Sequence, residues 1–280
     1  MEKPMIVYKY LPPERQCFLD NLLIRFTQPS ELNDPFECIP FVPEMDIRPF
    51  VEEIINREKT AVDLLGSKNE KRLFRQKVPM LRASLRQNYI NDPNILANNF
   101  LDFFLKETNH KDRGIGILSL SRRWDSSLMW GHYGKSHQGF CVGFKNEHSF
   151  FNDLEGQNPD IGLLRKVHYS KVRVVATIAI GEHSEVDFDP LYTKCSDWEY
   201  EQEERLIRLL ADCTQRVSRV DQPDVCLFNI PKDAIAEVIV GAKAPDDLKT
   251  KLKTFANELS IPFYKARVSR RDFDMERLEE

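Results

Sequence analysis

The chain has 280 residues, of which 41% are hydrophobic and 30% are charged, and its formal net charge is −4. This composition provides enough apolar side chains for a core, which excludes general disorder. The weak negative charge excludes binding of polyanions by overall charge alone. No apolar run approaches the roughly 18 residues that span a bilayer, and the first residues lack the apolar segment of a signal peptide. We therefore expect a cytoplasmic protein with no membrane partner.

The first part of the chain predicts two short strands, then a loop and a helical block. Apolar and aromatic residues that favour strands dominate 6–10 and 23–27. Residues 28–43 are dense in Pro, Asn and Asp and predict a loop. From about 46 to 108 the apolar residues recur at helical spacing, which predicts a helical insertion between strands.

Strands dominate the prediction from residue 114 onward. Asp125 is expected to cap a short helix, and Pro245 is expected to begin a longer one that ends at Leu259. The expected strands are 115–121, 139–144, 166–169, 172–180, 203–210, 225–230, 237–240 and 263–268. The charged residues 269–280 are expected to fray. The irregular order of strands and helices predicts a single α+β domain over 1–280, with a mixed, mostly antiparallel β core.

The segment from Trp198 to Arg205 is the strongest candidate for a chemical centre. If it is a strand, Glu199, Glu201 and Glu203 share one face with Arg205, because side chains alternate between the faces of a strand. Neighbouring carboxylates raise one another's proton affinity, and Arg205 offsets part of that effect. The alternative is an exposed helix in which Glu201 and Arg205 form an i,i+4 pair. The apolar residues that follow favour the strand.

The loop after the second strand is a further candidate. Asn33 and Asp34 precede a proline, and these residue types together predict a rigid turn. A second interpretation is that the loop forms the wall of a ligand cleft beside Arg25 and Thr27. The residues by themselves leave both interpretations open.

Two aromatic residues follow the strand that ends at Ser121. Trp130 and Tyr133 lie at i and i+3 of the short predicted helix, so they share a face that can stack a planar ring or pack in the core. His132 and His137 show no third ligand nearby, and no Gly-x-Ser-x-Gly sequence is present. Neither a zinc site nor a Ser-His-Asp triad is therefore predicted.

The first predicted strand places a cation between two aromatic residues. Tyr8 and Tyr10 point to the face opposite Lys9. Lys9 is either a ligand for phosphate or carboxylate or a surface lysine.

These segments together resemble a family of bacterial proteins, the domain-of-unknown-function family 2971. The matching segments are Tyr8–Tyr10, Arg25–Phe26, Asn33–Glu37, Ser119–Ser121, Met129–Tyr133, Gly139–Phe144, Trp198–Arg205 and Ile239–Gly241. They keep the order of the family pattern over nearly the whole chain, except in the helical block. The family implies no activity.

The layout is also similar to that of ADP-ribosyltransferases, which implies an NAD-consuming enzyme. In that class a carboxylate on a late strand holds a hydroxyl of the nicotinamide ribose and stabilises an oxocarbenium-like transition state. The resemblance implies Glu203 as the catalytic carboxylate and Glu201 as its helper. Lys9 departs from the class pattern, in which this position is His or Arg. The residues implied to contact NAD are Tyr8, Lys9, Tyr10, Arg25, Thr27, Asn33, Asp34, Ser121, Trp130, Tyr133, Trp198 and Arg205.

The sequence therefore predicts an ADP-ribosyltransferase-like enzyme that uses NAD to modify a macromolecule, either nucleic acid or protein. We expect a toxin or phage-defence effector, with an antitoxin or regulator as a further partner and with no metal. One alternative is a non-catalytic module that senses a ligand or partner. Another is a metal-dependent nuclease that uses Asp34, Glu201 and Glu203.

Overall fold

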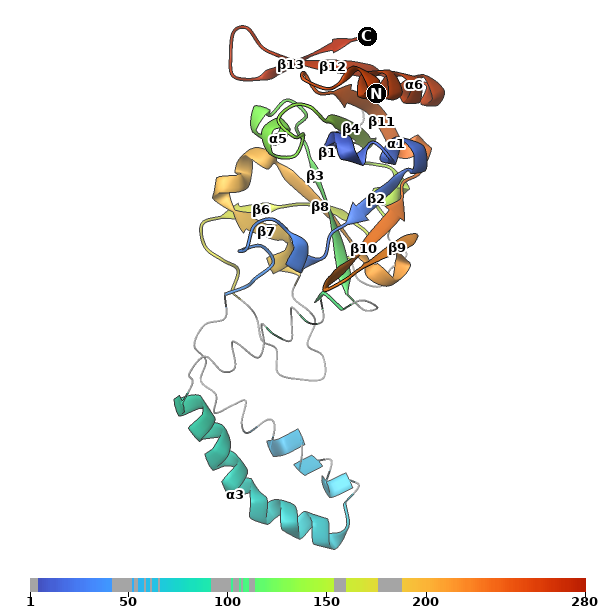
Figure 1. The fold of residues 1–280 in the computed structure, drawn as a ribbon. Coiled ribbons are helices and arrows are strands. Elements are labelled where there is room, and N and C mark those ends of the chain that lie inside the picture. Colours follow the sequence, from blue (N-terminus) through green and yellow to red (C-terminus); the bar gives the residue numbers. More distant parts are fainter. Residues whose placement is uncertain are drawn as a thin grey trace. The chain divides into compact units, whose positions relative to one another are not determined.

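The computed structural model describes residues 5–41, 114–153, 160–175 and 188–280 continuously. It also describes residues 66–91 and short stretches elsewhere between 52 and 110. The chain forms two compact units (Figure 1). Unit 1 consists of Met1–Cys38, Glu107–Val172 and Leu191–Glu280, and unit 2 of Ile39–Lys106 and Arg173–Pro190.

Within the described residues, unit 1 is built on an eight-stranded sheet with the order β13-β12-β11-β4-β1-β3-β8-β5. Its strands are β1 (Ile6–Leu11), β3 (Ile115–Ser121), β4 (Phe140–Lys145), β5 (Leu164–Lys166), β8 (Glu203–Leu209), β11 (Ile235–Val240), β12 (Phe263–Val268) and β13 (Met275–Glu279). Neighbouring strands are antiparallel except for β11 and β12, which are parallel. The predicted α+β class with a mixed, mostly antiparallel sheet is confirmed.

Two smaller sheets complete the β structure of unit 1. One has the order β2-β10-β9, and the other pairs β6 with β7. Their strands are β2 (Leu23–Phe26), β6 (His168–Ser170), β7 (Thr193–Cys195), β9 (Gln215–Arg219) and β10 (Gln222–Asn229). Thr27, directly after β2, forms a bridge with Ile117 of β3, which joins the smaller sheet to the large one.

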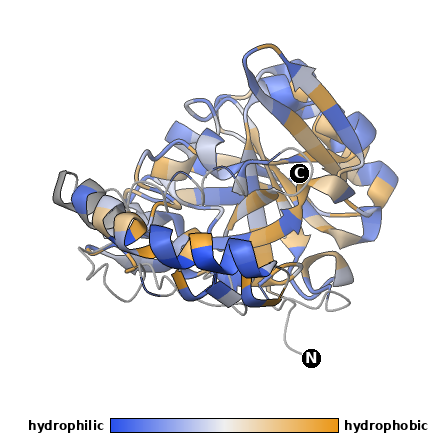
Figure 2. Cartoon of the chain, turned by 90° about the horizontal axis from the view of Figure 1, so that it is seen from below, coloured by the Kyte–Doolittle hydropathy of each residue, from blue (hydrophilic) through white to orange (hydrophobic). Residues whose placement is uncertain are grey.

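The central strands of the large sheet carry apolar side chains on both faces, and these belong to two core clusters. In β1, Val7 and Leu11 join the larger cluster, whereas Tyr8 and Tyr10 join a smaller one that contains Trp130. Hydrophobic residues accordingly follow the strands of unit 1 in Figure 2. Lys9 therefore lies on the face of β1 opposite the two tyrosines, as the alternation predicted.

The C-terminal part of the chain closes one edge of the large sheet. Helix α6 (Asp246–Leu259) packs against β11 and β12, and Leu248, Leu252 and Phe255 are its buried residues of largest side chain. The expectation that 269–280 would fray is wrong, because β13 pairs with β12 along its whole length. Charged strands at a sheet edge are usual, since their outer face is solvated.

The short helix α5 (Ser127–His132) begins one residue later than predicted. Its N-cap is Ser126, whose side chain accepts a hydrogen bond from the backbone N–H of Met129. Asp125 is not the cap and instead forms an ion pair with Arg123. Serine and aspartate are both favourable N-cap residues, and here the carboxylate of Asp125 is paired with Arg123 instead.

Two further strand predictions need correction. The strand expected over 166–169 is divided at Val167 into β5 and β6, which belong to different sheets. The strand expected over 172–180 does not begin at Val172, which lies in a bend, and residues 176–180 lie outside the described residues. The described part of unit 1 also contains the short α-helix α1 (Phe18–Asn21).

Unit 2 contains the long helix α3 (Lys68–Asn91), which has Pro79 inside it. Phe41 and Val175 form a bridge that joins the two segments of this unit. The helical block predicted over 46–108 thus contains a described helix, and its status as an insertion in one domain stays a prediction. Among the described residues, no helix combines the length and the apolar character needed to cross a bilayer.

Candidate functional site

The Trp198–Arg205 segment changes its conformation halfway, and this change brings two carboxylates together. Residues Ser196–Glu201 form a 3-10 helix, and Gln202 follows with a left-handed φ of 44° before β8 begins at Glu203. Glu201 and Glu203 are buried, whereas Glu199 is exposed. The prediction of one strand face holding Glu199, Glu201 and Glu203 is therefore wrong, because β8 starts only at Glu203.

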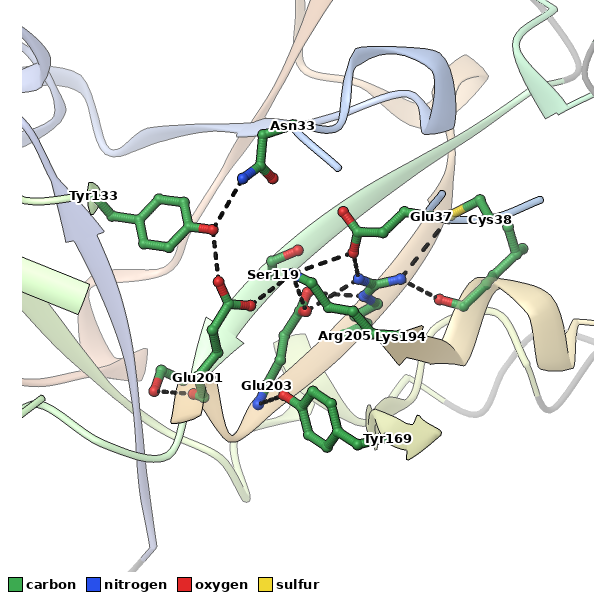
Figure 3. Close-up of polar contacts among 12 residues, drawn as sticks. Asn33, Glu37, Cys38, Ser119, Tyr133, Tyr169, Lys194, Glu201, Glu203 and Arg205 are labelled. Carbon is green, nitrogen blue, oxygen red and sulfur yellow. Dashed lines mark hydrogen bonds and ion pairs between the residues drawn. The ribbon is translucent and has the colours of Figure 1, made fainter. Parts of the chain in front are cut away.

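Glu203 is held by Arg205 on the same face of β8 (Figure 3). The Arg205 guanidinium donates from Nε to Glu203 Oε1 at 2.8 Å and from its second terminal nitrogen to Oε2 at 3.0 Å. Arg205 is fully buried, and it also donates to the carbonyl of Leu191 at 2.6 Å and to the carboxylate of Glu37. A buried guanidinium needs such complete pairing, since an unpaired charge in the interior is very costly.

Lys194 connects the three carboxylates. Its Nζ lies 2.6 Å from Glu201 Oε2, 3.3 Å from Glu203 Oε2 and 3.3 Å from Glu37 Oε1. We call Glu37, Lys194, Glu201, Glu203 and Arg205 the charge cluster. Three carboxylates and two cations thus share one buried region.

Glu201 also faces a tyrosine. The Tyr133 hydroxyl donates to Glu201 Oε1 at 2.6 Å, and the Asn33 amide donates to the Tyr133 oxygen at 3.3 Å. Figure 3 shows Asn33, Tyr133 and Glu201 as a chain of polar contacts. Burial, followed by the nearby Glu201 charge, raises the pKa of Tyr133 far above its usual range, so this hydroxyl remains a donor.

The pKa values of the two neighbouring carboxyl groups are shifted in opposite directions. Burial alone raises the pKa of Glu203, but Arg205 and Lys194 outweigh it and lower the pKa to about 2. Burial raises the pKa of Glu201, and Lys194 and Tyr133 compensate only part of that effect. Glu203 is thus a fixed anion at neutral pH, and Glu201 is the member of the pair that accepts a proton more readily. A pair whose environments separate its acidities in this way is typical of acid–base sites.

The charge cluster borders a cavity of about 210 Å³. Its wall includes many of the residues that the sequence singled out: Tyr8, Lys9, Tyr10, Thr27, Asn33, Ser121, Tyr133, Glu201 and Glu203. Lys9 donates to the backbone carbonyl of Ser119 at 2.8 Å. Burial, partly opposed by the Glu203 charge, lowers the pKa of Lys9 to about 8. The cavity wall therefore combines four carboxyl groups, those of Glu31, Glu37, Glu201 and Glu203, with the Lys9 amine, whose pKa is lowered to about 8.

The other predicted contact residues lie away from the cavity wall. Trp130 is fully buried in the smaller core cluster, with its ring 5.2 Å from that of Tyr10. Asp34 accepts from the backbone N–H of Phe36 and fixes the loop, and Arg25 pairs with Glu31. The Trp198 ring lies 4.8 Å from Lys194 Nζ, a cation–π contact outside the cavity.

Sequence reasoning missed two members of the charge cluster, Glu37 and Lys194. Glu37 belongs to the Asn33–Glu37 motif, so the motif itself was a signal for it. Lys194 lies in the three-residue strand β7 and carries no local signature. It reaches the cluster because β7 lies directly before the 3-10 helix Ser196–Glu201.

The carboxylate oxygens of the charge cluster form ion pairs with Lys194 and Arg205 of the same chain. Within the described residues, no group of three or more His, Cys, Asp or Glu side chains has a metal-binding arrangement. Asp34, the third residue of the nuclease alternative, does not contribute to the cavity wall as described. That alternative stays an untested prediction.

The fold and the site define an α+β protein in which a buried charge cluster borders a small cavity. Residues 129–206 match the family described as "Protein of unknown function (DUF2971)". The match runs from α5 to β8 and includes Tyr133, Lys194, Glu201 and Glu203, so the resemblance to this family is confirmed over that segment. Searches of curated proteins and of solved structures gave no match. The similarity to ADP-ribosyltransferases stays a prediction.

Proposed function

We propose that this protein is an ADP-ribosyltransferase-like enzyme, which transfers ADP-ribose from NAD to a nucleic acid or a protein. One observation carries the proposal. Lys9 of β1, Thr27 after β2, Glu201 at the end of the 3-10 helix and Glu203 at the start of β8 line one cavity. These residues lie far apart in the sequence, and nothing in their order along the chain requires them to meet.

The charge cluster suits the chemistry of this reaction. The bond between nicotinamide and the ribose carbon breaks with both electrons on nicotinamide, and the acceptor atom bonds that carbon and loses a proton. Glu203, fixed as an anion by Arg205, stabilises positive charge that develops at the sugar. Glu201 orients a sugar hydroxyl or takes the acceptor's proton. Tyr133 positions Glu201 through its hydrogen bond.

Backbone strain near the cavity supports a functional role. Of the eight described non-glycine residues with positive φ, two adjoin members of the charge cluster: Cys38 and Gln202. Cys38 is adjacent to Glu37, and Gln202 separates Glu201 from Glu203. Such conformations cost about 1–3 kcal/mol each and gather where a function requires a particular geometry.

The size of the cavity determines which part of NAD it receives. Its volume of about 210 Å³ lies below the range of about 300–1,000 Å³ that holds a drug-sized ligand. The nicotinamide end would enter the cavity beside Glu201 and Glu203, and the remainder of the dinucleotide would lie outside. Tyr133 and Tyr8 are aromatic residues of the wall that suit a planar ring.

The proposal is tested with NAD labelled on its ADP-ribose part. The purified protein is incubated with this NAD and with separate RNA, DNA and protein fractions of a bacterial lysate, and nicotinamide release and label transfer are measured. We expect both for the wild type, and a loss of at least a hundredfold in Glu203→Gln and in Glu201→Gln. Glu199→Gln is the matched control, because this exposed residue of the same segment lies outside the cavity wall.

The result that contradicts the proposal is equally concrete. A folded wild-type protein that releases no nicotinamide and labels no fraction is not such an enzyme. Circular dichroism of each variant separates loss of chemistry from loss of fold. Retention of full activity in both glutamine variants would assign the chemistry to other residues.

A non-catalytic sensing module is the second candidate, and the pairing of the charge cluster favours it. Every carboxylate of the cluster contacts Lys194 or Arg205, so the cluster could serve as a rigid wall. Glu203→Gln separates the candidates. Loss of turnover with retained NAD binding supports the enzyme, whereas binding without turnover in both proteins supports the module.

The cellular role follows from the same proposal. An enzyme that modifies a macromolecule of its host would act in the cytoplasm as a toxin or phage-defence effector, held in check by an antitoxin or regulator. Induced expression in a bacterium should arrest growth for the wild type and for Glu199→Gln, but not for Glu203→Gln. Equal growth of all three strains at equal protein levels would contradict this role.

A further inference from the structure

A second hollow, of about 560 Å³, adjoins the cavity in unit 1. The two share Lys9, Tyr10, Thr27 and Tyr133 in their walls, so these residues lie between the two hollows. The wall of the second hollow is completed by Leu11, Pro12, Arg15, Ile24, Arg25, His132 and Lys135. We call this hollow the basic groove.

The charges of the basic groove all have one sign. Its described wall carries Lys9, Arg15, Arg25 and Lys135, and no carboxylate is among the described residues that line it. The whole chain has a net charge of −4, so this collection of cations is not a result of composition. Arg15 and Arg25 both act to lower the pKa of Lys9, as expected for cations close enough to repel one another.

Three of these cations form no strong ion pair within the described part of the chain. Lys9 donates to an uncharged carbonyl. No side-chain hydrogen bond or ion pair of Arg15 is seen in the part of the chain that the structure describes. Lys135 pairs with Glu14 at a position where both side chains are more than half exposed, and such a pair contributes little.

Arg25 has the firmest partner of the four. It donates to Glu31 at 2.7 Å, but the same carboxylate oxygen also receives Arg219. One carboxylate therefore faces two guanidinium groups, which leaves positive charge uncompensated beside the groove. A set of cations held together in this way favours an anion that bridges them.

We propose that the basic groove binds the pyrophosphate of a small nucleotide-type ligand, whose other end enters the cavity at Lys9. Arg15 and Arg25 suit phosphate oxygens because a guanidinium presents several donors in one plane. The groove volume lies within the range for small-molecule sites. In its choice of ligand this inference rests on the proposed function, since NAD carries a pyrophosphate, but binding of phosphate by the groove requires no turnover.

Isothermal titration calorimetry of the whole protein at low salt tests the inference. The probes are inorganic pyrophosphate, ADP and adenosine, and the proteins are the wild type, Arg15→Gln, Lys135→Gln and Arg270→Gln. Arg270 is an exposed arginine outside the groove wall and serves as the matched control. We expect pyrophosphate and ADP to bind the wild type, and adenosine to bind at least tenfold more weakly.

The variants show whether the groove is responsible. Arg15→Gln should weaken the binding of ADP at least tenfold, Lys135→Gln about threefold, and Arg270→Gln less than twofold. Higher salt should weaken the binding of ADP to the wild type, because the attraction is screened. A folded wild type that binds neither pyrophosphate nor ADP at millimolar concentration overturns the inference. Equal losses in Arg15→Gln and Arg270→Gln overturn it as well.

These outcomes are distinguishable from a failure of the proposed function. Binding of ADP through Arg15 without nicotinamide release from NAD would support phosphate binding by the groove and contradict the proposed enzymatic function. Nicotinamide release that is unaffected by Arg15→Gln, with no measurable ADP binding, would support the proposed enzymatic function and contradict phosphate binding by the groove. A 5′-phosphorylated oligonucleotide that competes better than ADP would assign the groove to nucleic acid and overturn the small-ligand inference.

Discussion

The charge cluster and the basic groove both border the cavity, and each contributes one lysine to its wall. Lys194, in the cluster, contacts three carboxylates, whereas Lys9, in the groove, donates to an uncharged carbonyl. Burial lowers the pKa of both lysines. In Lys194 the carboxylates outweigh burial and raise the pKa, but in Lys9 burial prevails and the pKa is about 8. The two regions therefore use the same residue type for opposite purposes.

The difference shows what each region can do. In the cluster, every charge has a partner, so the geometry is fixed, and three carboxylates against two cations leave a net negative charge when all of them are ionised. In the groove, the cations lack carboxylates in the described wall, so the groove presents a positive field to a ligand. A site that binds an anion at one end and stabilises a cationic centre at the other needs both arrangements.

The largest expected effect concerns the buried pairing of the charge cluster. Arg205→Met should lower the free energy of unfolding by about 3–5 kcal/mol, because Glu203 and Glu37 lose a fully buried partner. Urea denaturation followed by circular dichroism measures this change. Arg270→Met, at an exposed position, should stay within about 0.5 kcal/mol of the wild type. A similar small change in Arg205→Met would mean that the cluster does not support the fold.

The second effect is a pH dependence of stability that comes from Glu203. Its pKa is about 2 in the folded protein and 4.5 in the absence of its surroundings, so ionised Glu203 stabilises the fold above about pH 5. This contribution, on the order of 3 kcal/mol, is lost as the pH falls from about 5 to about 2. The free energy of unfolding of the wild type should therefore approach that of Glu203→Gln over this range. A constant difference between the two proteins would contradict the assignment.

A smaller effect is expected at the contact between the cavity wall and the cluster. Tyr133→Phe removes the hydroxyl that donates to Glu201 at 2.6 Å, and a hydrogen bond to a charged group contributes about 1.5–3 kcal/mol. Because the site borders a cavity that water can enter, we expect the lower end of this range. Thermal unfolding measures the change, with Tyr264→Phe as the control on β12. If Tyr133→Phe is as stable as the wild type, the contact does not form in solution.

The last effect is measured on the chemical reactivity of Lys9 rather than on stability. With a pKa of about 8, its neutral amine is on the order of 100-fold more abundant at pH 8 than that of a lysine with the usual 10.5. Burial is the main cause, and Arg15 and Arg25 also lower the pKa while Glu203 and Glu201 raise it. Labelling with an amine-selective reagent, followed by mass spectrometry, should show a midpoint near pH 8.

A ligand sharpens the same experiment. Pyrophosphate should protect Lys9 from labelling if it occupies the basic groove, because it favours the charged amine. Lys9→Arg identifies the labelled peptide by its disappearance. A labelling midpoint near pH 10.5 would show that Lys9 is solvated and would remove the contrast with Lys194.

Local patterns in the sequence were sufficient for most of the β structure of unit 1. Strands β1, β3, β4, β8 and β12 follow from short runs of apolar and aromatic residues, since these residues pack on both faces of a sheet. The opposite placement of Lys9 and its two tyrosine neighbours follows from alternation alone. The elements that were wrongly predicted depend on distant partners. The charged strand β13 exists because β12 offers it an edge, which no local pattern reveals.

The candidate site divides in the same way. The sequence by itself predicted that Glu201, Glu203 and Arg205 form one site, because they are charged residues close together in the sequence beside an apolar strand. Only the tertiary structure decided which charges meet. Glu37 lies 168 positions from Arg205, and Lys194 is brought to Glu201 by the 3-10 helix Ser196–Glu201 that lies between them. Ion pairs act over a few ångströms of space, so their partners depend on the topology of the sheet rather than on their order along the chain.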